Sequence, residues 1–496
     1  MTSLAPMGPA ASVGTTAWAG LCPPLRSPRP PERRPAGQGR LKTGFRHAAQ
    51  GWRYPAVGKG AGAVRVLIVS WPWRTHFQPM VPLGWAFQAA GHEVRVASSP
   101  DLAESLTASG LTAVVAGPGD VLKTMYEQFT EEQVELVRML EQLGSRDDFF
   151  FDFASATKEA LTWDRLRLRT RYFTQILQGV NDAMVEELVD YCRWWKPDLV
   201  VWEWMSHAGA IVARATGAAS ARIRSEIDVD AWSRRAFLRL RKEQAPHRRE
   251  DALADWLGGW AAKFGTSFSE EMVTGHFTIE HMLGSMRLDS DVPHLPLRYV
   301  SYHGPAVIAH WARSTPKKPR VLATFGISQK KGREYQAVSV RQLQQILDCL
   351  ADLDIELVVT APEKVRRNLS RIPSNAMLTE FVPLHAVVPT CSAVIHHGGI
   401  PAFMESIASG VPQLMVGRVV GDIDLRAPLL EAARGGLYIP RPHLCGQRVR
   451  ECLVRLLEEP AFKEGAQRLR REQATQPAPS ELVAELEKLT ARYRAR

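Results

Sequence analysis

The feature that most constrains the fold is a strand, loop and helix unit that occurs twice in the chain, about 250 residues apart. Residues 64–70 (VRVLIVS) form a β-branched apolar run typical of a buried parallel strand, and a helix of about residues 80–90 and the strand 93–98 follow. The second unit begins at residues 319–328 (PRVLATFGIS) and continues with a helix around residues 338–350. Two such βαβ beginnings predict an α/β protein with two Rossmann-like domains.

These units divide the 496 residues into predicted parts. An N-terminal segment rich in Pro, Gly and Ala, without apolar periodicity, predicts disorder, and a Pro-bearing stretch between the two units predicts a linker. A charged stretch of helical pattern predicts an insertion in the first domain. The predicted parts are a basic extension at 1–62, a first domain at 63–287 with a helical insertion at 121–193, a linker at 288–318, and a second domain with closing helices at 319–496.

The charge and cysteine content argue against several classes of protein. Residues 1–60 carry nine lysines or arginines against one acidic residue, so most of the net charge of +10 lies there, and the rest of the chain has no basic stripe typical of nucleic-acid binding. The six cysteines have no CxxC spacing, which argues against a disulfide framework or a structural zinc site and favours the reducing cytoplasm. No apolar run is long enough to span a membrane.

The strongest local motif is residues 391–416 (CSAVIHHGGIPAFMESIASGVPQLMV). It predicts a buried strand, a turn at Gly398 and Gly399, and a helix that begins near Pro401 and stops at Gly410. The N-terminus of such a helix presents unpaired N–H groups and a partial positive charge, which favour an anion such as a diphosphate. The same pattern equally fits an ordinary βα unit of a parallel sheet.

Several separate stretches together resemble one family. They are WPWRTHFQPMVPLGWAFQAAGHEVRVAS from residue 71, LRYVSYHGPAV at 297–307 and FVPLHAVVPTCSAVIHHGG at 381–399. From residue 64 onward the chain resembles the actinobacterial antibiotic glycosyltransferases of GT-B fold, most closely the branch that works with an activator protein resembling a cytochrome P450. The resemblance implies two domains facing each other across a cleft, which move a deoxysugar from a dTDP-sugar to a hydrophobic polyketide or related aglycone without a cofactor.

The resemblance also assigns the catalytic residues. His76, in the loop after the first strand, matches the family's histidine base, which takes the proton from the acceptor hydroxyl during inverting transfer. Glu203, at the end of PDLVVWE, stands where relatives carry an acid that orients this histidine and stabilises its protonated form. The side chain of Glu203 is one methylene longer than an aspartate at this position would be, which leaves the geometry of its pairing with His76 open. Asp198 is better read as a strand-boundary residue, and His207 as a structural or supporting one.

Donor binding is assigned by the same resemblance to the second domain. His397 is predicted to donate to a diphosphate oxygen beside the following turn, whereas His396 is predicted to pack at the strand end. Ala402 and Pro401 depart from the family pattern of a hydroxyl residue and a glycine. The donor residues are Gly398, Gly399, Gly326 and Ser328 near the phosphates, Phe381 at the base, Glu405 at the ribose, and Asp422 with Asp424 as fallback at the sugar.

Besides a metal-dependent transferase, two other classes of function are alternatives to this assignment. Two DxD-like strings, at 289–291 and 422–424, are the kind of motif that metal-dependent transferases use, but we expect no metal site because the first lies in the linker and the second falls at the predicted sugar site. A nicotinamide-dependent oxidoreductase would need GxGxxG after the first strand, and neither βαβ unit has it. A non-catalytic relative that binds a nucleotide sugar or a partner protein would keep the same fold.

Overall fold

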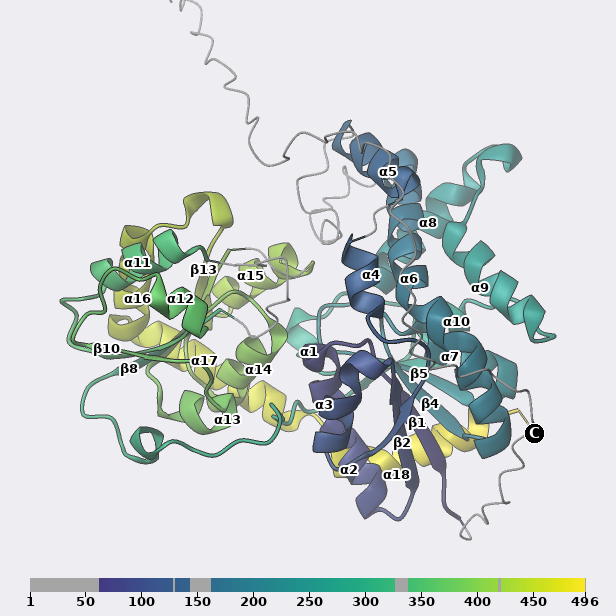
Figure 1. Ribbon diagram of the computed structural model, residues 1–496, viewed down its shortest axis with the longest axis horizontal. Helices are drawn as coiled ribbons and strands as arrows, with labels where there is room; N and C mark the ends of the chain where they lie inside the picture. The colour runs from purple at the N-terminus through teal and green to yellow at the C-terminus, as the bar shows by residue number, and fades with distance from the viewer. Residues whose placement is uncertain (1–61, 128–129, 143–161, 326–337, 418–420, 496) are drawn as a thin grey trace, which may run out of the picture. The chain divides into compact units, whose positions relative to one another are not determined.

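The computed structural model describes residues 62–127, 130–142, 162–325, 338–417 and 421–495. The predicted extension at 1–62 lies, apart from its last residue, outside these ranges. The predicted phosphate residues Gly326 and Ser328 lie outside them as well. The described residues form two lobes, each built on a parallel sheet, which confirms the predicted fold class (Figure 1).

The first lobe contains a seven-stranded sheet in the order β3-β2-β1-β4-β5-β6-β7, with every neighbouring pair parallel. Successive strands are added outward from β1 on one side and from β4 on the other, so the strand order reverses between β1 and β4. In such sheets the crevice at this switch point is where ligands bind. The strands are β1 (Arg65–Val69), β2 (Glu93–Ser98), β3 (Thr112–Val115), β4 (Leu199–Glu203), β5 (Ala219–Arg224), β6 (Phe277–Glu280) and β7 (His294–Pro296).

Alternate side chains of each central strand enter two different cores, as the period of two in a strand requires. Leu67 and Val69 of β1 pack in one core with the long helix α6, while Val66 and Ile68 pack in the other with α2. The predicted helical insertion at 121–193 is helical where it is described. The helices of this lobe are α1 (Arg74–Phe77), α2 (Val81–Ala89), α3 (Ala103–Ala108), α4 (Val121–Glu127), α5 (Glu131–Gln142), α6 (Trp163–Trp195), α7 (His207–Thr216), α8 (Val229–Lys242), α9 (Ala252–Lys263) and α10 (Glu271–Thr274).

The second lobe contains a six-stranded parallel sheet in the order β10-β9-β8-β11-β12-β13. The strand order reverses between β8 and β11, so the HHGG turn that follows β11 lies at the switch point of this sheet. The elements are β8 (Arg320–Thr324), α11 (Val340–Cys349), β9 (Glu356–Thr360), α12 (Glu363–Arg367), β10 (Ala376–Thr379), α13 (Leu384–Val387), β11 (Ala393–His396), α14 (Ile400–Ser409), β12 (Gln413–Val416), α15 (Ile423–Ala432), β13 (Gly436–Ile439), α16 (Gly446–Glu458) and α17 (Pro460–Thr475).

Two segments lie elsewhere than the sequence predicts. Part of the predicted linker, residues 294–296, is the edge strand β7 of the first sheet, paired with β6. The last helix, α18 (Pro479–Tyr493), packs on the first sheet although its sequence position assigns it to the second domain. Leu482 and Leu486 of α18 are buried in the core that contains Val66 and Ile68, where α18 contacts α2 and β5. Figure 1 shows α18 beside these elements.

Candidate active site

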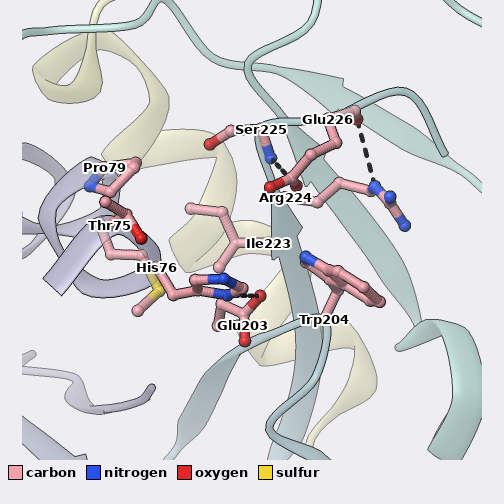
Figure 2. A pocket seen from close by; sticks show the side chains of 10 residues that line it. Thr75, His76, Pro79, Glu203, Trp204, Ile223, Arg224, Ser225 and Glu226 are labelled. Carbon is pink, nitrogen blue, oxygen red and sulfur yellow. Dashed lines mark hydrogen bonds and ion pairs between the residues drawn. The ribbon is translucent and has the colours of Figure 1, made fainter. Parts of the chain in front are cut away.

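His76 and Glu203 meet at the switch point of the first sheet. His76 lies in the one-turn helix α1 after β1, and Glu203 is the last residue of β4. The parallel register pairs Val69 with Trp202, so the two chain segments leave the sheet side by side. The imidazole Nδ1 of His76 lies 2.9 Å from Oε1 of Glu203, and Figure 2 shows the two groups facing each other. The added methylene of glutamate is therefore accommodated.

The surroundings hold this pair in place. The second carboxylate oxygen of Glu203 accepts the N–H of Met205 at 3.1 Å and the hydroxyl of Ser206 at 3.4 Å. Trp73 meets the imidazole of His76 edge-on, with ring centroids 5.0 Å apart. Both side chains are largely buried, with exposed fractions of 13% and 5% for His76 and Glu203. A carboxylate fixed in this way orients the ring and can stabilise a positive charge on it.

A small pocket opens beside the pair and is drawn in Figure 2. Trp204 and Ile223 form apolar walls, and the carboxylate of Glu226 is an acidic group that the sequence analysis did not single out. Glu226 follows β5 by two residues in an irregular loop, and no motif marks it. Burial raises the pKa of Glu226 above its ordinary value. The pocket is lined by Thr75, His76, Pro79, Met80, Glu203, Trp204, Ile223, Arg224, Ser225 and Glu226.

Two arginines of β5 lie fully buried beneath this loop. Arg222 and Arg224 both bind the carboxylate of Asp228, and Arg224 also binds Asp230 at 2.7 Å. Burial by itself would raise the pKa of Asp228, but the two guanidinium groups hold it below its ordinary value. Asp228 also caps α8 by accepting the N–H of Ala231 at 3.0 Å. The cluster fixes the course of the loop that carries Glu226.

The HHGG turn of the second lobe joins β11 to α14, as predicted. His396 is fully buried, and its ring bridges Gln413, at 2.7 Å, and the N–H of Gly398, at 3.1 Å. Burial lowers its pKa to about 3, so the ring is neutral and holds the turn. The helix ends at Gly410 in a left-handed conformation, which confirms the predicted stop.

His397 lies on the turn beside the first residues of α14. Its Nδ1 is buried and has no hydrogen-bond partner in the described part of the chain, so this atom is available to a ligand. Burial lowers its pKa to about 4. A Cβ on Gly399 would lie 2.6 Å from Nε2 of His397, so only glycine lets the ring sit over the backbone here. The arrangement suits an anion at the helix N-terminus.

Asp422 precedes α15 and is buried between protein groups of both lobes. Its Oδ1 is 3.0 Å from the buried guanidinium of Arg426, and its Oδ2 accepts the N–H of Ile227, from the first lobe, at 3.1 Å. Arg426 also donates to the carbonyl of Gly398 at 2.7 Å. This carboxylate therefore connects the HHGG turn with the loop after β5. Its predicted contact with the sugar stays a prediction, as does that of Asp424 in the first turn of α15.

The predicted nucleoside residues differ in accessibility. Phe381 is 39% exposed and can meet a ligand. Glu405 is 4% exposed, and its carboxylate accepts the hydroxyls of Ser301 and Ser409, so in the described contacts it is bound to protein groups. Burial raises the pKa of Glu405. Asp198 and His207 are structural, as predicted, because Asp198 accepts the N–H of Arg65 and His207 packs between two tryptophans.

Neither a metal-binding cluster nor a membrane-spanning helix occurs in the part of the chain that the structure describes. No group of three or more His, Cys, Asp or Glu in this part of the chain is placed to hold a metal ion. Among the described helices, none combines the length and apolar character needed to cross a membrane.

Comparison with known proteins decides the family. The N-terminal domain model of the erythromycin biosynthesis protein CIII-like family matches residues 85–326, and its C-terminal domain model matches residues 344–489. The chain belongs to the EryCIII-like family. Two relatives each align with 87% of the EryCIII-like chain.

One relative is the aclacinomycin-T 2-deoxy-L-fucose transferase of Streptomyces galilaeus, 39% identical over 434 residues, which are 87% of this chain and 97% of that protein. Another is the 10-deoxymethynolide desosaminyltransferase of Streptomyces venezuelae, 40% identical over 87% of this chain and 98% of that protein. The EryCIII-like chain is therefore a glycosyltransferase.

Solved structures agree with this assignment. The glycosyltransferase VinC in complex with dTDP aligns with a TM-score of 0.76 and 32% identity, over 86% of this chain and 100% of VinC. The spinosyn forosaminyltransferase SpnP aligns with a TM-score of 0.68 and 34% identity, over 86% of this chain and 99% of SpnP. The EryCIII-like chain has the GT-B fold, and the oxidoreductase alternative is set aside.

Proposed function

We propose that this EryCIII-like protein transfers a deoxysugar from a dTDP-sugar to a hydroxyl of a polyketide or related aglycone, with inversion at the anomeric carbon and without a metal ion. The observation that carries the proposal is the 2.9 Å contact between His76 and Glu203 beside a pocket at the switch point of the first sheet. The names of the relatives, an aclacinomycin-T 2-deoxy-L-fucose transferase and a 10-deoxymethynolide desosaminyltransferase, support the substrate classes.

In this proposal the first lobe carries the base. Glu203 engages Nδ1 of His76, which directs proton uptake to Nε2. The acceptor hydroxyl gives its proton to Nε2 while its oxygen bonds to the anomeric carbon, and the bond from that carbon to the diphosphate breaks on the opposite face. Glu203 stabilises the imidazolium that forms, and dTDP leaves with the bonding electron pair.

The second lobe stabilises the leaving group. We assign the diphosphate to the N-terminus of α14, whose N–H groups and dipole favour negative charge. Nδ1 of His397 lies buried beside it with no hydrogen-bond partner among the described residues, which supports this assignment. Phe381 is exposed enough to pack on the thymine base. Preorganised donors of this kind act where charge develops in the transition state.

The direct test is transfer itself. The intact protein is incubated with several dTDP-deoxysugars and a set of macrolactone and anthracyclinone acceptors, with and without EDTA and with and without a cytochrome-P450-like activator. We expect a glycoside whose anomeric configuration, measured by NMR, is opposite to that of the donor, at a rate that EDTA leaves unchanged. The activator is expected to raise this rate.

Three outcomes would contradict parts of the proposal. Retention of configuration would exclude a direct displacement assisted by His76. Loss of activity in EDTA would show that a metal takes part. Binding of dTDP without turnover of any donor, even with the activator, would favour the non-catalytic alternative.

The glycine turn provides a test of the diphosphate assignment. Gly398 has a φ of +86°, and a Cβ there would lie 2.6 Å from Cδ1 of Ile423. We expect Gly398→Ala to move the turn and to weaken dTDP binding by about tenfold or more, which corresponds to at least ~1.4 kcal/mol. Isothermal titration calorimetry with dTDP measures the change.

Gly91→Ala is the matched control for this experiment. Gly91 has a φ of +87° but no atom within 4 Å of the added Cβ, and it lies after α2 in the first lobe. It reproduces the backbone strain without the clash and should leave dTDP affinity unchanged. Equal affinity of the Gly398→Ala variant and the wild type would place the diphosphate elsewhere.

A further inference from the structure

Glu226 is an acidic side chain in the pocket that the proposed mechanism does not use. It lies in the loop between β5 and α8, is half-buried, and lines the same pocket as His76 and Glu203. Its carboxylate accepts the N–H of Ser225 at 3.3 Å, and no lysine or arginine among the described residues forms an ion pair with it. Figure 2 shows its side chain on the pocket wall above Ile223.

The charges around Glu226 do not neutralise it. The two arginines of β5 are matched by two aspartates, and the aspartate at the start of α15 is matched by an arginine one turn later. These balanced neighbours are Arg222, Arg224, Asp228, Asp230, Asp422 and Arg426. With His76 neutral, as a base must be before transfer, the carboxylates of Glu203 and Glu226 leave the pocket with excess negative charge. A ligand that brings a positive charge would compensate it.

Glu226 lies close to the place where the transferred sugar is proposed to bind. The next residue, Ile227, donates its N–H to Asp422 of the second lobe at 3.1 Å, so Glu226 lies where the loop of the first lobe touches the donor-binding lobe. His76, on the same pocket, has to reach the acceptor oxygen beside the anomeric carbon. A sugar held between the His397 turn and His76 would therefore bring its ring substituents near Glu226.

We propose that Glu226 determines sugar specificity by binding a positively charged amino group on the ring of the transferred sugar. This inference rests on the proposed function, because it takes the sugar to lie between His76 and the His397 turn. An ammonium or alkylammonium group donates a hydrogen bond to the carboxylate and also brings a positive charge. A hydroxyl at the same ring carbon can donate a hydrogen bond but brings no positive charge. The site would therefore select amino-deoxysugars over neutral deoxysugars.

The test compares two donors that differ at one atom. A dTDP-3-amino-3,6-dideoxyhexose and the dTDP-6-deoxyhexose of the same configuration are titrated into the intact protein by calorimetry, with dTDP alone as reference. We expect the wild type to bind the amino donor about 10- to 100-fold more tightly than the hydroxyl donor, the range given by a hydrogen bond to a charged group. Glu226→Gln should reduce this ratio to below about threefold while leaving the affinity for dTDP unchanged.

Controls separate this role from others. Glu104→Gln, an exposed glutamate of the same lobe, should keep the wild-type ratio. A wild-type ratio near one, or a ratio that Glu226→Gln leaves unchanged, would overturn the inference. If Glu226→Gln lowered the transfer rate of both donors equally, the carboxylate would be stabilising positive charge in the transition state, and the inference would also fail. Absence of dTDP binding by the wild type would instead reject the proposed function.

Discussion

Replacement of His76 by alanine is expected to lower kcat for sugar transfer by about 10²- to 10⁴-fold, the contribution of a positioned general base. The Kd for dTDP should stay within about twofold, because the residues assigned to the diphosphate belong to the second lobe. Initial rates measured by chromatography, combined with calorimetric titration of dTDP, separate the two quantities. A variant that kept the wild-type rate would show that His76 is not the base.

Glu203→Gln shows whether the two residues act as one unit. It keeps the shape of the side chain but removes the charge that orients and stabilises the imidazole, so kcat should fall in the same direction as in His76→Ala. The double variant should be no slower than His76→Ala alone, because residues that act together are not additive. His247→Ala, at an exposed histidine, should leave the rate unchanged. Additive losses in the double variant would separate Glu203 from the proton transfer.

Asp228→Asn is expected to lower the free energy of unfolding by about 3–5 kcal/mol, because it removes the carboxylate shared by two buried guanidinium groups. The amide keeps the volume of the side chain and its acceptor for the cap of α8, so the lost charge is the main change. Guanidinium chloride titration of the intact protein, monitored by fluorescence of the first-lobe tryptophans, measures the difference.

Asp230→Asn is the matched control. Among the described residues Asp230 forms its ion pair with Arg224 alone, and it is half-buried rather than fully buried. Asp230→Asn should therefore lower the free energy of unfolding by less than Asp228→Asn does. Equal stability of Asp228→Asn and the wild type would show that the buried arginines are compensated by other groups. Asp228 and Asp230 both lie just after Glu226 in the chain. The transfer rates of the two variants should therefore be compared at temperatures where each is folded.

Much of the fold could be predicted because its signals are local. Runs such as VRVLIVS are apolar on both faces, which is typical of a parallel strand covered on two sides. The glycine and proline around α14 mark where that helix begins and ends. The positions of α18 and β7 could not be predicted in this way. Their apolar residues show that a face is buried but not which sheet buries it.

Part of the candidate site could likewise be predicted from the sequence, and part could not. The family resemblance placed His76 and Glu203 together, and their positions, just after β1 and at the end of β4, bring both to the edge where parallel strands end. The environments of Asp422 and Glu405 could not be predicted, since their partners, Ile227 and Ser301, are about 100 or more residues away in the chain. Glu226 belongs to no motif, and only the folded loop brings its carboxylate to the pocket.

The packing of α18 has a practical consequence for dissecting this enzyme. Leu482, Val483 and Leu486 complete the core of the first lobe, although they are encoded after the whole of the second. A gene fragment that stops at β7 would leave an apolar surface bare and should aggregate, whereas one fused to residues 479–493 through a flexible tether restores the missing cover. Deletions that remove α18 therefore perturb the lobe that contains His76.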